Sequence, residues 1–401
     1  MLANKPSSAL TQSPSSRCSR PSRRGMFIIR WLSRALPLPH AHNKLSTPYL
    51  HEEQYQPPSW ANPYIKLVPH SRLGLAQLPT PVHRWHLPGL PEGVEVFIKR
   101  DDITGMQLYA GLDCHLVLRT SRQVVDSDPG LTGNLLVSRL VGATLHLVTK
   151  EEYAREGSMR LGQAVVDKLR AQGKNPYLVP VGGSSALGTW GYLQASEELR
   201  QQTSGMGISD VVMACGSGGT SAGLCLGLHL AMPNPRIAVH AYGVCDDPDY
   251  FYDYIDGLLT ELGVWDGKGG TSSVPSARGL LRVVQARGTG YAMSTDAELQ
   301  TMKEVAEETG VILDPVYSGK AIHGLIAEMR ASPQAWQGRR VLFLHTGGLL
   351  GMYDKEDQLR QLLGGKQGYG HKVERLEVNT TSSSGADVRL QVGDVQHGMM
   401  Q

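Results

Sequence analysis

Strand-like and helix-like segments alternate along the chain from about Val94 to about Leu363. Short runs rich in branched apolar residues, such as Val211–Cys215 and Val341–His345, predict buried strands. Longer stretches with apolar residues on one stripe, such as Glu151–Gln172, predict helices between them. Strands that alternate with helices of this length form βαβ units around a mostly parallel sheet. The sequence therefore predicts an α/β protein.

The same patterns give an expected extent for each segment. The expected strands are Val94–Ile98, Leu116–Leu118, Leu145–Val148, Tyr177–Val179, Val211–Cys215, Ile237–Tyr242, Leu281–Gln285 and Val341–His345. The expected helices are Leu131–Val141, Glu151–Gln172, Leu187–Arg200, Thr220–Ala231, Tyr250–Leu262, Asp296–Glu308, Lys320–Arg330 and Leu349–Leu363.

One interval breaks the alternation. Lys99–Asp113 separates two expected strands but has no helical pattern. Parallel neighbours in one sheet need a crossover of about a dozen residues or more. Either a segment is missing at this place, or the two strands belong to different sheets.

Charge and composition exclude several classes of function. The sequence has no Asp or Glu before Glu52 but eight Lys or Arg residues there, so residues 52–401 carry a net charge of −6. An acidic body argues against nucleic-acid binding. The apolar runs, such as those near Val341–Leu344 and Leu349–Met352, are too short to span a membrane. Five cysteines without CxxC spacing, and His83-x-x-His86 without a carboxylate partner, give no support for disulfides or a metal site.

The two ends differ from the body. Residues 1–50 are acid-poor and rich in Arg and Ser, which predicts an organelle transit peptide, mitochondrial or alternatively plastid; a disordered basic tail is the other interpretation. Within this region Met26–Arg34 predicts a short basic amphipathic helix. Residues 365–401 are polar and predict a loosely ordered tail.

A glycine-rich loop is the strongest indication of a binding site. It follows the expected strand Val211–Cys215 and opens the expected helix Thr220–Ala231. Glycines let backbone amides converge on a phosphate, and the helix N-terminus adds positive potential. The loop has neither the Walker lysine nor the third glycine of a dinucleotide fingerprint, so we expect it to anchor a monophosphate. The candidate residues are Gly216, Ser217, Gly218, Gly219 and Thr220.

Three further residues are candidates because they follow strands or precede a helix. Thr346 comes directly after the expected strand Val341–His345, at the carboxyl edge of the sheet where ligands bind in α/β proteins. Tyr317 precedes the expected helix Lys320–Arg330, and Tyr291 follows Gly288-Thr289-Gly290. Either tyrosine alone could equally be part of the core.

The motifs taken together resemble the D-cysteine desulfhydrase and 1-aminocyclopropane-1-carboxylate (ACC) deaminase family. The resemblance covers residues 58–363. The matching motifs are Leu78–Trp85, Phe97–Gly105, Pro129–Asn134, Pro180–Ser185, Cys215–Gly223, Asp314–Lys320 and His345–Gly348. It implies the tryptophan-synthase-β-like fold of pyridoxal-phosphate enzymes (fold type II), with two three-layer αβα domains and a truncated small domain. We expect residues 51–108 and 200–364 to form the large cofactor-binding domain and residues 109–199 the small one.

The resemblance also implies roles. Pyridoxal 5′-phosphate would be held through its phosphate by the loop at 216–220, and Thr346 would face the pyridine nitrogen, where a neutral hydroxyl moderates electron withdrawal. Tyr291 and Tyr317 would be the catalytic residues on the substrate side and move protons. ACC deaminases carry Glu where this chain has Ser318. That difference favours a lyase that converts D-cysteine to pyruvate, hydrogen sulfide and ammonia over an ACC deaminase.

The chain departs from the family in one respect that affects catalysis. The family's Ser-Gly-Asn-Lys segment, whose lysine forms the Schiff base, and its Gly-Gly-x-Gln-Ser-Asn loop have no counterpart, and Gln107-Leu108 runs directly into Tyr109-Ala110. Lys99 and Lys320 are the remaining lysines near the expected site, and we expect both to be surface or structural residues. The sequence therefore predicts impaired turnover of a small amino-acid substrate. The alternative is a non-catalytic isoform that binds the cofactor or the intact subunit; the family implies a homodimer.

Overall fold

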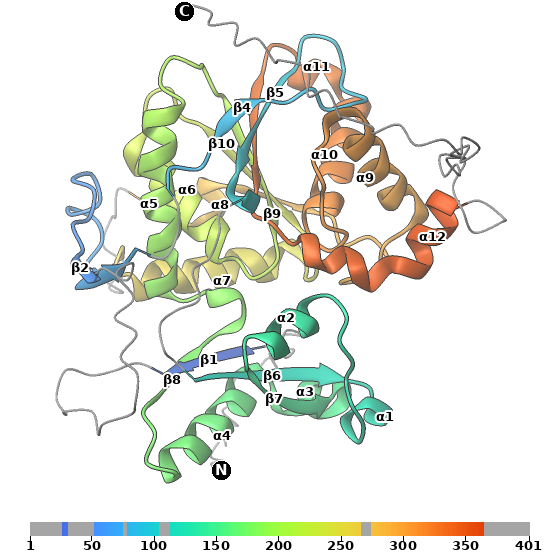
Figure 1. The fold of residues 1–401 in the computed structure, drawn as a ribbon. Helices are drawn as coiled ribbons and strands as arrows, with labels where there is room; N and C mark the ends of the chain where they lie inside the picture. The colour runs from blue at the N-terminus through green and yellow to red at the C-terminus, as the bar shows by residue number, and fades with distance from the viewer. Residues whose placement is uncertain (1–25, 31–51, 75–77, 104–112, 266–273, 365–401) are drawn as a thin grey trace, which may run out of the picture.

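The computed structural model describes residues 26–30, 52–74, 78–103, 113–265 and 274–364, and of residues 26–30 it describes the backbone. Two bodies are visible in Figure 1, a large one built on a six-stranded sheet and a smaller one below it built on a four-stranded sheet. A two-stranded ribbon, β2 (Glu52–Gln54) with β3 (Ser71–Leu73), lies beside the large body.

The large sheet has the strand order β11-β10-β9-β12-β5-β4. All neighbouring pairs are parallel except β4 with β5, which is antiparallel at the edge. The strands are β4 (Val82–Arg84), β5 (Glu95–Arg100), β9 (Asp210–Cys215), β10 (Ala238–Gly243), β11 (Arg282–Gln285) and β12 (Arg340–His345). The central strands β9 and β12 are apolar over Val211–Cys215 and Val341–Leu344, because both faces of the sheet are covered by helices.

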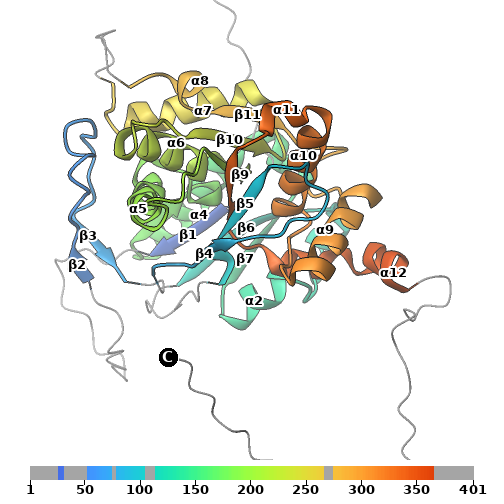
Figure 2. The same ribbon diagram turned by 90° about the horizontal axis from the view of Figure 1, so that it is seen from above.

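Helices cover the large sheet on both sides, as the two views show (Figures 1 and 2). On one face are α5 (Ala186–Gln202), α6 (Gly219–Ala231), α7 (Pro248–Glu261) and α8 (Ala277–Leu280). On the other are α9 (Asp296–Thr309), α10 (Ser318–Ala331) and α11 (Pro333–Trp336). After β12 the chain forms the 3-10 helix η3 (Leu349–Lys355) and α12 (Glu356–Gly364). This confirms the predicted α/β class.

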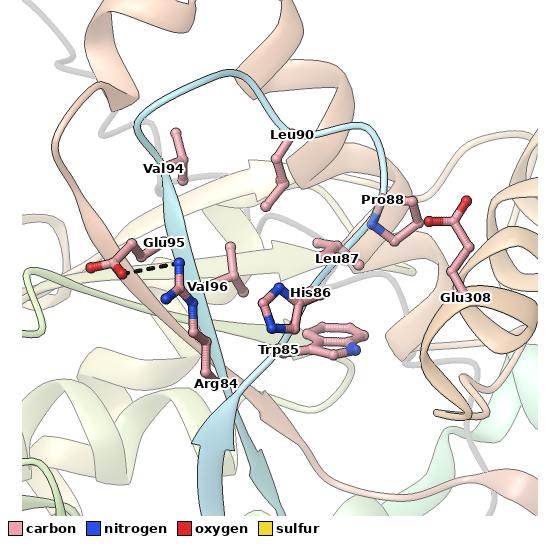
Figure 3. Close-up of a pocket in the computed structure, with 10 residues that line it drawn as sticks. All are labelled: Arg84, Trp85, His86, Leu87, Pro88, Leu90, Val94, Glu95, Val96 and Glu308. Atoms are coloured by element: carbon pink, nitrogen blue, oxygen red, sulfur yellow. Dashed lines mark ion pairs between the residues drawn. The ribbon is translucent and has the colours of Figure 1, made fainter.

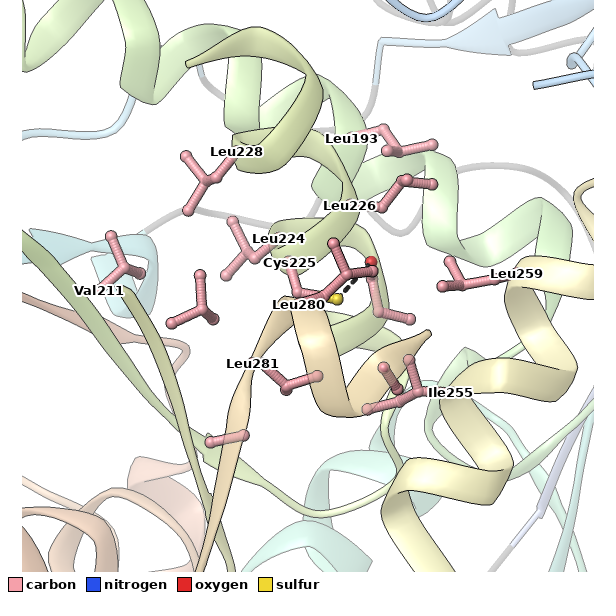
Figure 4. Close-up of a cluster of buried hydrophobic side chains, with 14 of the residues drawn as sticks. Leu193, Val211, Leu224, Cys225, Leu226, Leu228, Ile255, Leu259, Leu280 and Leu281 are labelled. Atoms are coloured by element: carbon pink, nitrogen blue, oxygen red, sulfur yellow. Dashed lines mark hydrogen bonds between the residues drawn. The ribbon is translucent and has the colours of Figure 1, made fainter. Parts of the chain in front are cut away.

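Helix α6 is buried on all sides, between the sheet and α5, α7 and α8 (Figure 4). Leu224 and Leu226 are completely buried, and each contributes about 1.5–3 kcal/mol by leaving water. Gly227 lets α5 approach closely, since a Cβ atom there would lie 2.2 Å from Ser196 Oγ. The core therefore fixes the direction in which the N-terminus of α6 points.

The small sheet has the order β7-β6-β1-β8. Strands β6 (Cys114–Thr120) and β7 (Thr144–Thr149) are parallel, whereas β1 (Met26–Arg30) runs antiparallel to both β6 and β8 (Pro176–Val179). The associated helices are α1 (Arg122–Val125), α2 (Asn134–Leu140), α3 (Lys150–Glu156) and α4 (Ser158–Ala171). Short 3-10 turns, η1 (Asp101–Ile103) and η2 (Val181–Gly183), connect elements.

The position of β1 corrects one prediction. Residues Met26–Arg30 form a central strand and not the start of an amphipathic helix; residues 31–34 lie outside the described residues. A pattern of four consecutive apolar residues suits a buried strand as well as a helix, and pairing with two neighbours decides in favour of the strand. The predicted transit and tail regions otherwise lie outside the described residues.

The structure also decides between the two alternatives for the interval after β5. Strands β5 and β6 belong to different sheets, which is the second of the two alternatives predicted for Lys99–Asp113. Residues 104–112 lie outside the described residues. The break in the strand–helix alternation therefore no longer indicates a missing segment. The family resemblance still does.

Two expected helices are each divided. The stretch Glu151–Gln172 consists of α3 and α4, because Gly157 with φ 78° interrupts it. The stretch Leu349–Leu363 begins as η3 and continues as α12.

Helix α5 packs on α6 within the core of the large body, so we propose that the domain boundary lies before Ala186 and not at residue 199. Within the described residues no helix is long and apolar enough to cross a membrane.

Candidate active site

The glycine-rich loop joins the end of β9 to the start of α6 at the carboxyl edge of the large sheet. Gly218 has φ 94°, a left-handed conformation that a residue with a side chain adopts only with strain. A Cβ atom at Gly216 would lie 2.5 Å from Cε1 of Tyr317. The loop thus needs glycine at both positions, at one for backbone shape and at the other for contact with the tyrosine ring.

A serine from the segment that connects β8 of the small sheet to α5 of the large body reaches into this loop. The Ser184 hydroxyl donates to Ser217 Oγ at 2.7 Å and accepts from the Gly219 amide at 3.1 Å. The carbonyl of Ser184 in turn accepts from the Tyr254 hydroxyl at 2.7 Å. Ser184 belongs to the motif Pro180–Ser185, from which the sequence alone predicts no role for this serine. Hydroxyl groups from two elements therefore meet at the N-terminus of α6.

One buried hydroxyl near this helix terminus has no partner. Ser221 is fully buried, and its Oγ makes no hydrogen bond within the described residues. The neighbouring Thr220 is hydrogen-bonded to the Tyr192 phenol, and burial raises the pKa of that phenol, which keeps it neutral. An orphaned hydroxyl together with the positive end of a helix fits a phosphate group. The residues present therefore fit the phosphate of the implied cofactor.

The two predicted tyrosines lie together. Their hydroxyl oxygens are 2.7 Å apart, and their rings meet edge to face with centroids 6.1 Å apart. Tyr317 also packs on Gly216, so the pair adjoins the phosphate loop. The guanidinium of Arg119, from β6 of the small sheet, lies 5.9 Å from the Tyr291 ring centroid. The structure thus brings together residues that are far apart in sequence.

Thr346 lies at the same edge of the sheet. Strands β12 and β9 are parallel with Leu344 opposite Met213, so Thr346 is level with Cys215 at the start of the loop. Thr346 is exposed, and its hydroxyl makes no hydrogen bond within the described residues. It is therefore accessible to a ligand at this edge of the sheet.

Ser318 stands at the position that favours D-cysteine over ACC as the substrate, and its side chain contacts Asp314. Its hydroxyl donates to Asp314 Oδ1 at 2.7 Å, and its amide donates to the same oxygen at 2.7 Å. Asp314 also accepts from the Tyr317 amide at 2.8 Å, and its carboxylate caps the start of α10. The Ser318 side chain is thus buried in the cap that holds Tyr317 in place.

Lys99 and Lys320 are both buried and both paired. The ammonium of Lys99 contacts Glu198 at 2.5 Å, and that of Lys320 contacts Glu298 at 2.9 Å. Both are structural, as predicted, but neither is a surface residue. A buried ammonium that is enclosed by a carboxylate is not free to turn toward a ligand. Neither Lys99 nor Lys320 is therefore suited to hold the cofactor covalently. The described site fits the cofactor phosphate, but these two lysines do not replace the missing one.

A separate cavity of about 300 Å³ lies at the opposite edge of the large sheet (Figure 3). It is bordered by Trp85 and Leu87 after β4, by Val96 on β5 and by Glu308 on α9. Glu95, another lining residue, starts β5, so this cavity is at the amino ends of the strands. Ligand sites of open α/β sheets lie at the carboxyl ends. The cavity is therefore not part of the candidate site.

Comparisons with known proteins agree on one family. The sequence model described as "Pyridoxal-phosphate dependent enzyme" matches residues 106–347. The chain is 46% identical over 362 residues, 79% of this chain and 87% of the relative, to the Arabidopsis thaliana protein named "Bifunctional D-cysteine desulfhydrase/1-aminocyclopropane-1-carboxylate deaminase, mitochondrial". It is 29% identical to a putative ACC deaminase of Pyrococcus horikoshii, over 75% of this chain and 98% of the relative.

A solved structure described as an ACC deaminase homologue also resembles the fold. It has a TM-score of 0.59 and 27% identity, and the match covers 76% of this chain and 98% of that one. The Arabidopsis alignment spans 362 residues but takes up 79% of the 401 residues here, or about 317. About 45 positions of that relative consequently have no counterpart in this chain.

Proposed function

Because the chain belongs to the family of pyridoxal-phosphate-dependent enzymes, we propose that it is a desulfhydrase-type lyase by descent which binds the cofactor through its phosphate and turns over D-cysteine poorly. The observation that carries this proposal is the meeting of the phosphate loop, the tyrosine pair and Thr346 at one edge of the sheet. The name of the Arabidopsis relative supports the substrate.

The phosphate would be held by the amides and hydroxyls at the start of α6. Ser217 and Ser221 would supply hydroxyl groups, and the loop glycines carry no side chains that would shield the backbone amides. The Ser184 hydroxyl, which is bonded to the Gly219 amide, would turn toward the phosphate or give up this contact. The helix terminus adds electrostatic stabilisation of an anion, usually about 0.3–1 kcal/mol and more in buried geometries.

The remaining residues would act on the substrate side. When bound, the cofactor withdraws electrons from the α-carbon of the amino acid and so makes its proton acidic. Tyr317, capped by Asp314, and Tyr291 share one short hydrogen bond, so a proton can pass between their oxygens. Thr346 would present a neutral hydroxyl to the pyridine ring. No step is assigned to a lysine, because both buried lysines near the core are paired with carboxylates.

The missing lysine segment favours a second function for this chain. The alignment with the Arabidopsis relative, with about 45 unmatched positions, supports an omission of the size that the family resemblance implies. Loss of a covalent catalytic group usually lowers the rate by several orders of magnitude. We therefore infer that the chain acts as a cofactor-binding isoform, alone or in a dimer with an intact subunit. ACC deamination is less favoured, since the position of the deaminase Glu holds Ser318.

Two measurements test the proposal. Fluorescence titration should show pyridoxal 5′-phosphate binding at least about tenfold more tightly than pyridoxal, with inorganic phosphate competing, because the loop recognises the phosphate. Sulfide release from D-cysteine should be at least about 1000-fold slower than in a lysine-bearing relative, and ACC should not be turned over faster. Equal affinity for both forms of the cofactor would contradict the phosphate site.

We also propose a mitochondrial location, supported by the name of the Arabidopsis relative and by the five basic residues that precede β1, Lys5, Arg17, Arg20, Arg23 and Arg24. A fluorescent fusion at the C-terminus should colocalise with a mitochondrial marker; plastid fluorescence would favour the alternative. Co-purification of differently tagged copies tests the homodimer that the family implies.

A further inference from the structure

Lys320 makes more contacts than one ion pair requires. Its side chain is fully buried in the first turn of α10. The ammonium donates to both carboxylate oxygens of Glu298, at 2.9 and 3.0 Å. It also donates to the main-chain carbonyls of Arg287 at 3.1 Å and Met293 at 2.7 Å. These carbonyls are on the connection between β11 and α9, which is otherwise a loop.

The two carbonyls bracket Tyr291. Arg287 precedes this tyrosine by four positions and Met293 follows it by two, so a single ammonium holds the loop on both sides of the phenol. Next to the tyrosine, Ala292 has φ 59°, the one positive φ of a residue other than glycine within the described residues. Such a conformation costs about 1–3 kcal/mol and persists only where the surroundings hold it.

A second lysine supports the same loop from outside. Lys355, in η3, donates to the carbonyl of the strained Ala292 at 2.6 Å. Burial, and then the positive charge of Lys320, lower the pKa of Lys355. Gln358 in α12 donates to the Ser294 carbonyl at 3.3 Å. The loop's own backbone hydrogen bonds are two turn bonds, from the Gly290 amide to the Arg287 carbonyl and from the Met293 amide to the Gly290 carbonyl. Its described attachments to α10, η3 and α12 come from side chains.

The helix that carries Lys320 also carries the partner of Tyr291. Tyr317 is the residue immediately before α10, three positions ahead of Lys320. The first turn of the helix fixes the distance between these two side chains. When Lys320 binds the loop, it sets the position of Tyr291 relative to Tyr317, whose hydroxyl lies 2.7 Å away. Glu298, which begins α9 through a capping box with Thr295, neutralises the buried charge.

We propose that Lys320 is a positioning residue for the tyrosine pair: its ammonium, held by Glu298, clamps the Tyr291 loop onto α10 and so creates the hydrogen bond between Tyr291 and Tyr317. The inference depends on the proposed function only for the role of the tyrosines in moving protons. The clamp itself is a property of the chain without any cofactor.

The test is ¹⁹F NMR of the full chain labelled with 3-fluorotyrosine, without cofactor. Tyr291→Phe and Tyr317→Phe assign the two resonances. In Lys320→Met both resonances should move toward the position of solvent-exposed fluorotyrosine, while most of the other tyrosine signals stay in place. Lys99→Met is the matched control, because Lys99 is an equally buried lysine of the same body. Its ammonium is paired with Glu198 and donates to Thr80 and Gln202. This control variant should leave both resonances unmoved.

Each result decides the matter. A folded Lys320→Met variant with both resonances unmoved would overturn the proposal, as would equal movement in Lys99→Met. If Lys320→Met alone does not fold, Glu298→Gln/Lys320→Met leaves no unpaired buried charge and is expected to fold with both resonances moved. Failure of this double variant to fold would show that Lys320 holds the whole body and not the loop, which also overturns the proposal. Cofactor binding enters none of these outcomes, so they are separate from a failure of the proposed function.

Discussion

The ring of Tyr317 lies against the backbone of Gly216, so closely that a Cβ atom on the glycine would be 2.5 Å from the ring carbon Cε1. This contact couples the phosphate loop to the tyrosine pair, because Tyr317 is also bonded to Tyr291. Whatever moves the ring therefore affects both halves of the candidate site.

Gly216→Ala should displace Tyr317 and weaken cofactor binding. We expect about a tenfold loss of affinity for pyridoxal 5′-phosphate and a loss of about 1–3 kcal/mol in the free energy of unfolding, since overpacking forces the backbone or the ring to move. Fluorescence titration and urea denaturation measure the two effects. Gly191→Ala in α5 is the control, because a Cβ atom there meets nothing within 4 Å. It should leave affinity unchanged and stabilise the chain by up to about 1 kcal/mol. Equal effects of the two substitutions would contradict the role of the contact.

The second prediction concerns β1. This strand separates β6 from β8 and pairs with both, so its removal leaves two unpaired edges in the small sheet. Deleting residues 1–30 should lower the melting temperature and increase hydrogen exchange at the amides of β6 and β8. Deleting residues 1–25 keeps the strand and should change neither. If both deletions behave alike, β1 does not contribute to the fold.

The third prediction is a dependence of stability on pH. Hydrogen bonds from Arg200, together with those from Gln201 and Trp60, outweigh burial and lower the pKa of Glu197 from 4.5 to about 2. A carboxylate whose pKa is lower in the folded chain stabilises that chain at every pH above its pKa in the unfolded chain. This stability is lost as the pH falls from about 4.5 toward 2. The side chain of Arg200 is 45% exposed, so solvent screening limits the contribution to about 1 kcal/mol.

Glu197→Gln should therefore be less stable than the native chain by this amount at pH 7 and equally stable near pH 2. Urea denaturation across this range, followed by tryptophan fluorescence, measures the difference. A difference that stays constant with pH would show that Glu197 acts through packing and not through its charge.

Much of the fold could be predicted because periodicity is a local property. The expected strand Val341–His345 and helix Thr220–Ala231 agree with β12 and α6 to within one residue. Pairing is not local, and so the sequence did not show that β5 and β6 are in different sheets or that Met26–Arg30 is a central strand. In both cases the partner strands come from distant parts of the chain.

The candidate site could be predicted by residue type but not by its contacts. The loop at Gly216 and the tyrosines at 291 and 317 were identified as candidates, and the structure places them together. Ser184 and Lys320 were missed as parts of the site, since a serine or a lysine gives no periodic signal. Both come from motifs that were already noted, Pro180–Ser185 and Asp314–Lys320, and the positive φ of Ala292 appears in no sequence pattern.

We propose that this chain binds pyridoxal 5′-phosphate without a covalent lysine. The most direct test is to incubate the folded protein with the cofactor, reduce it with borohydride and locate any added mass by peptide mass spectrometry. We predict reversible, phosphate-dependent binding and no labelled lysine. A labelled lysine would contradict the claim. Lys355 would be the first position to examine, because its lowered pKa favours the neutral amine that attacks a carbonyl.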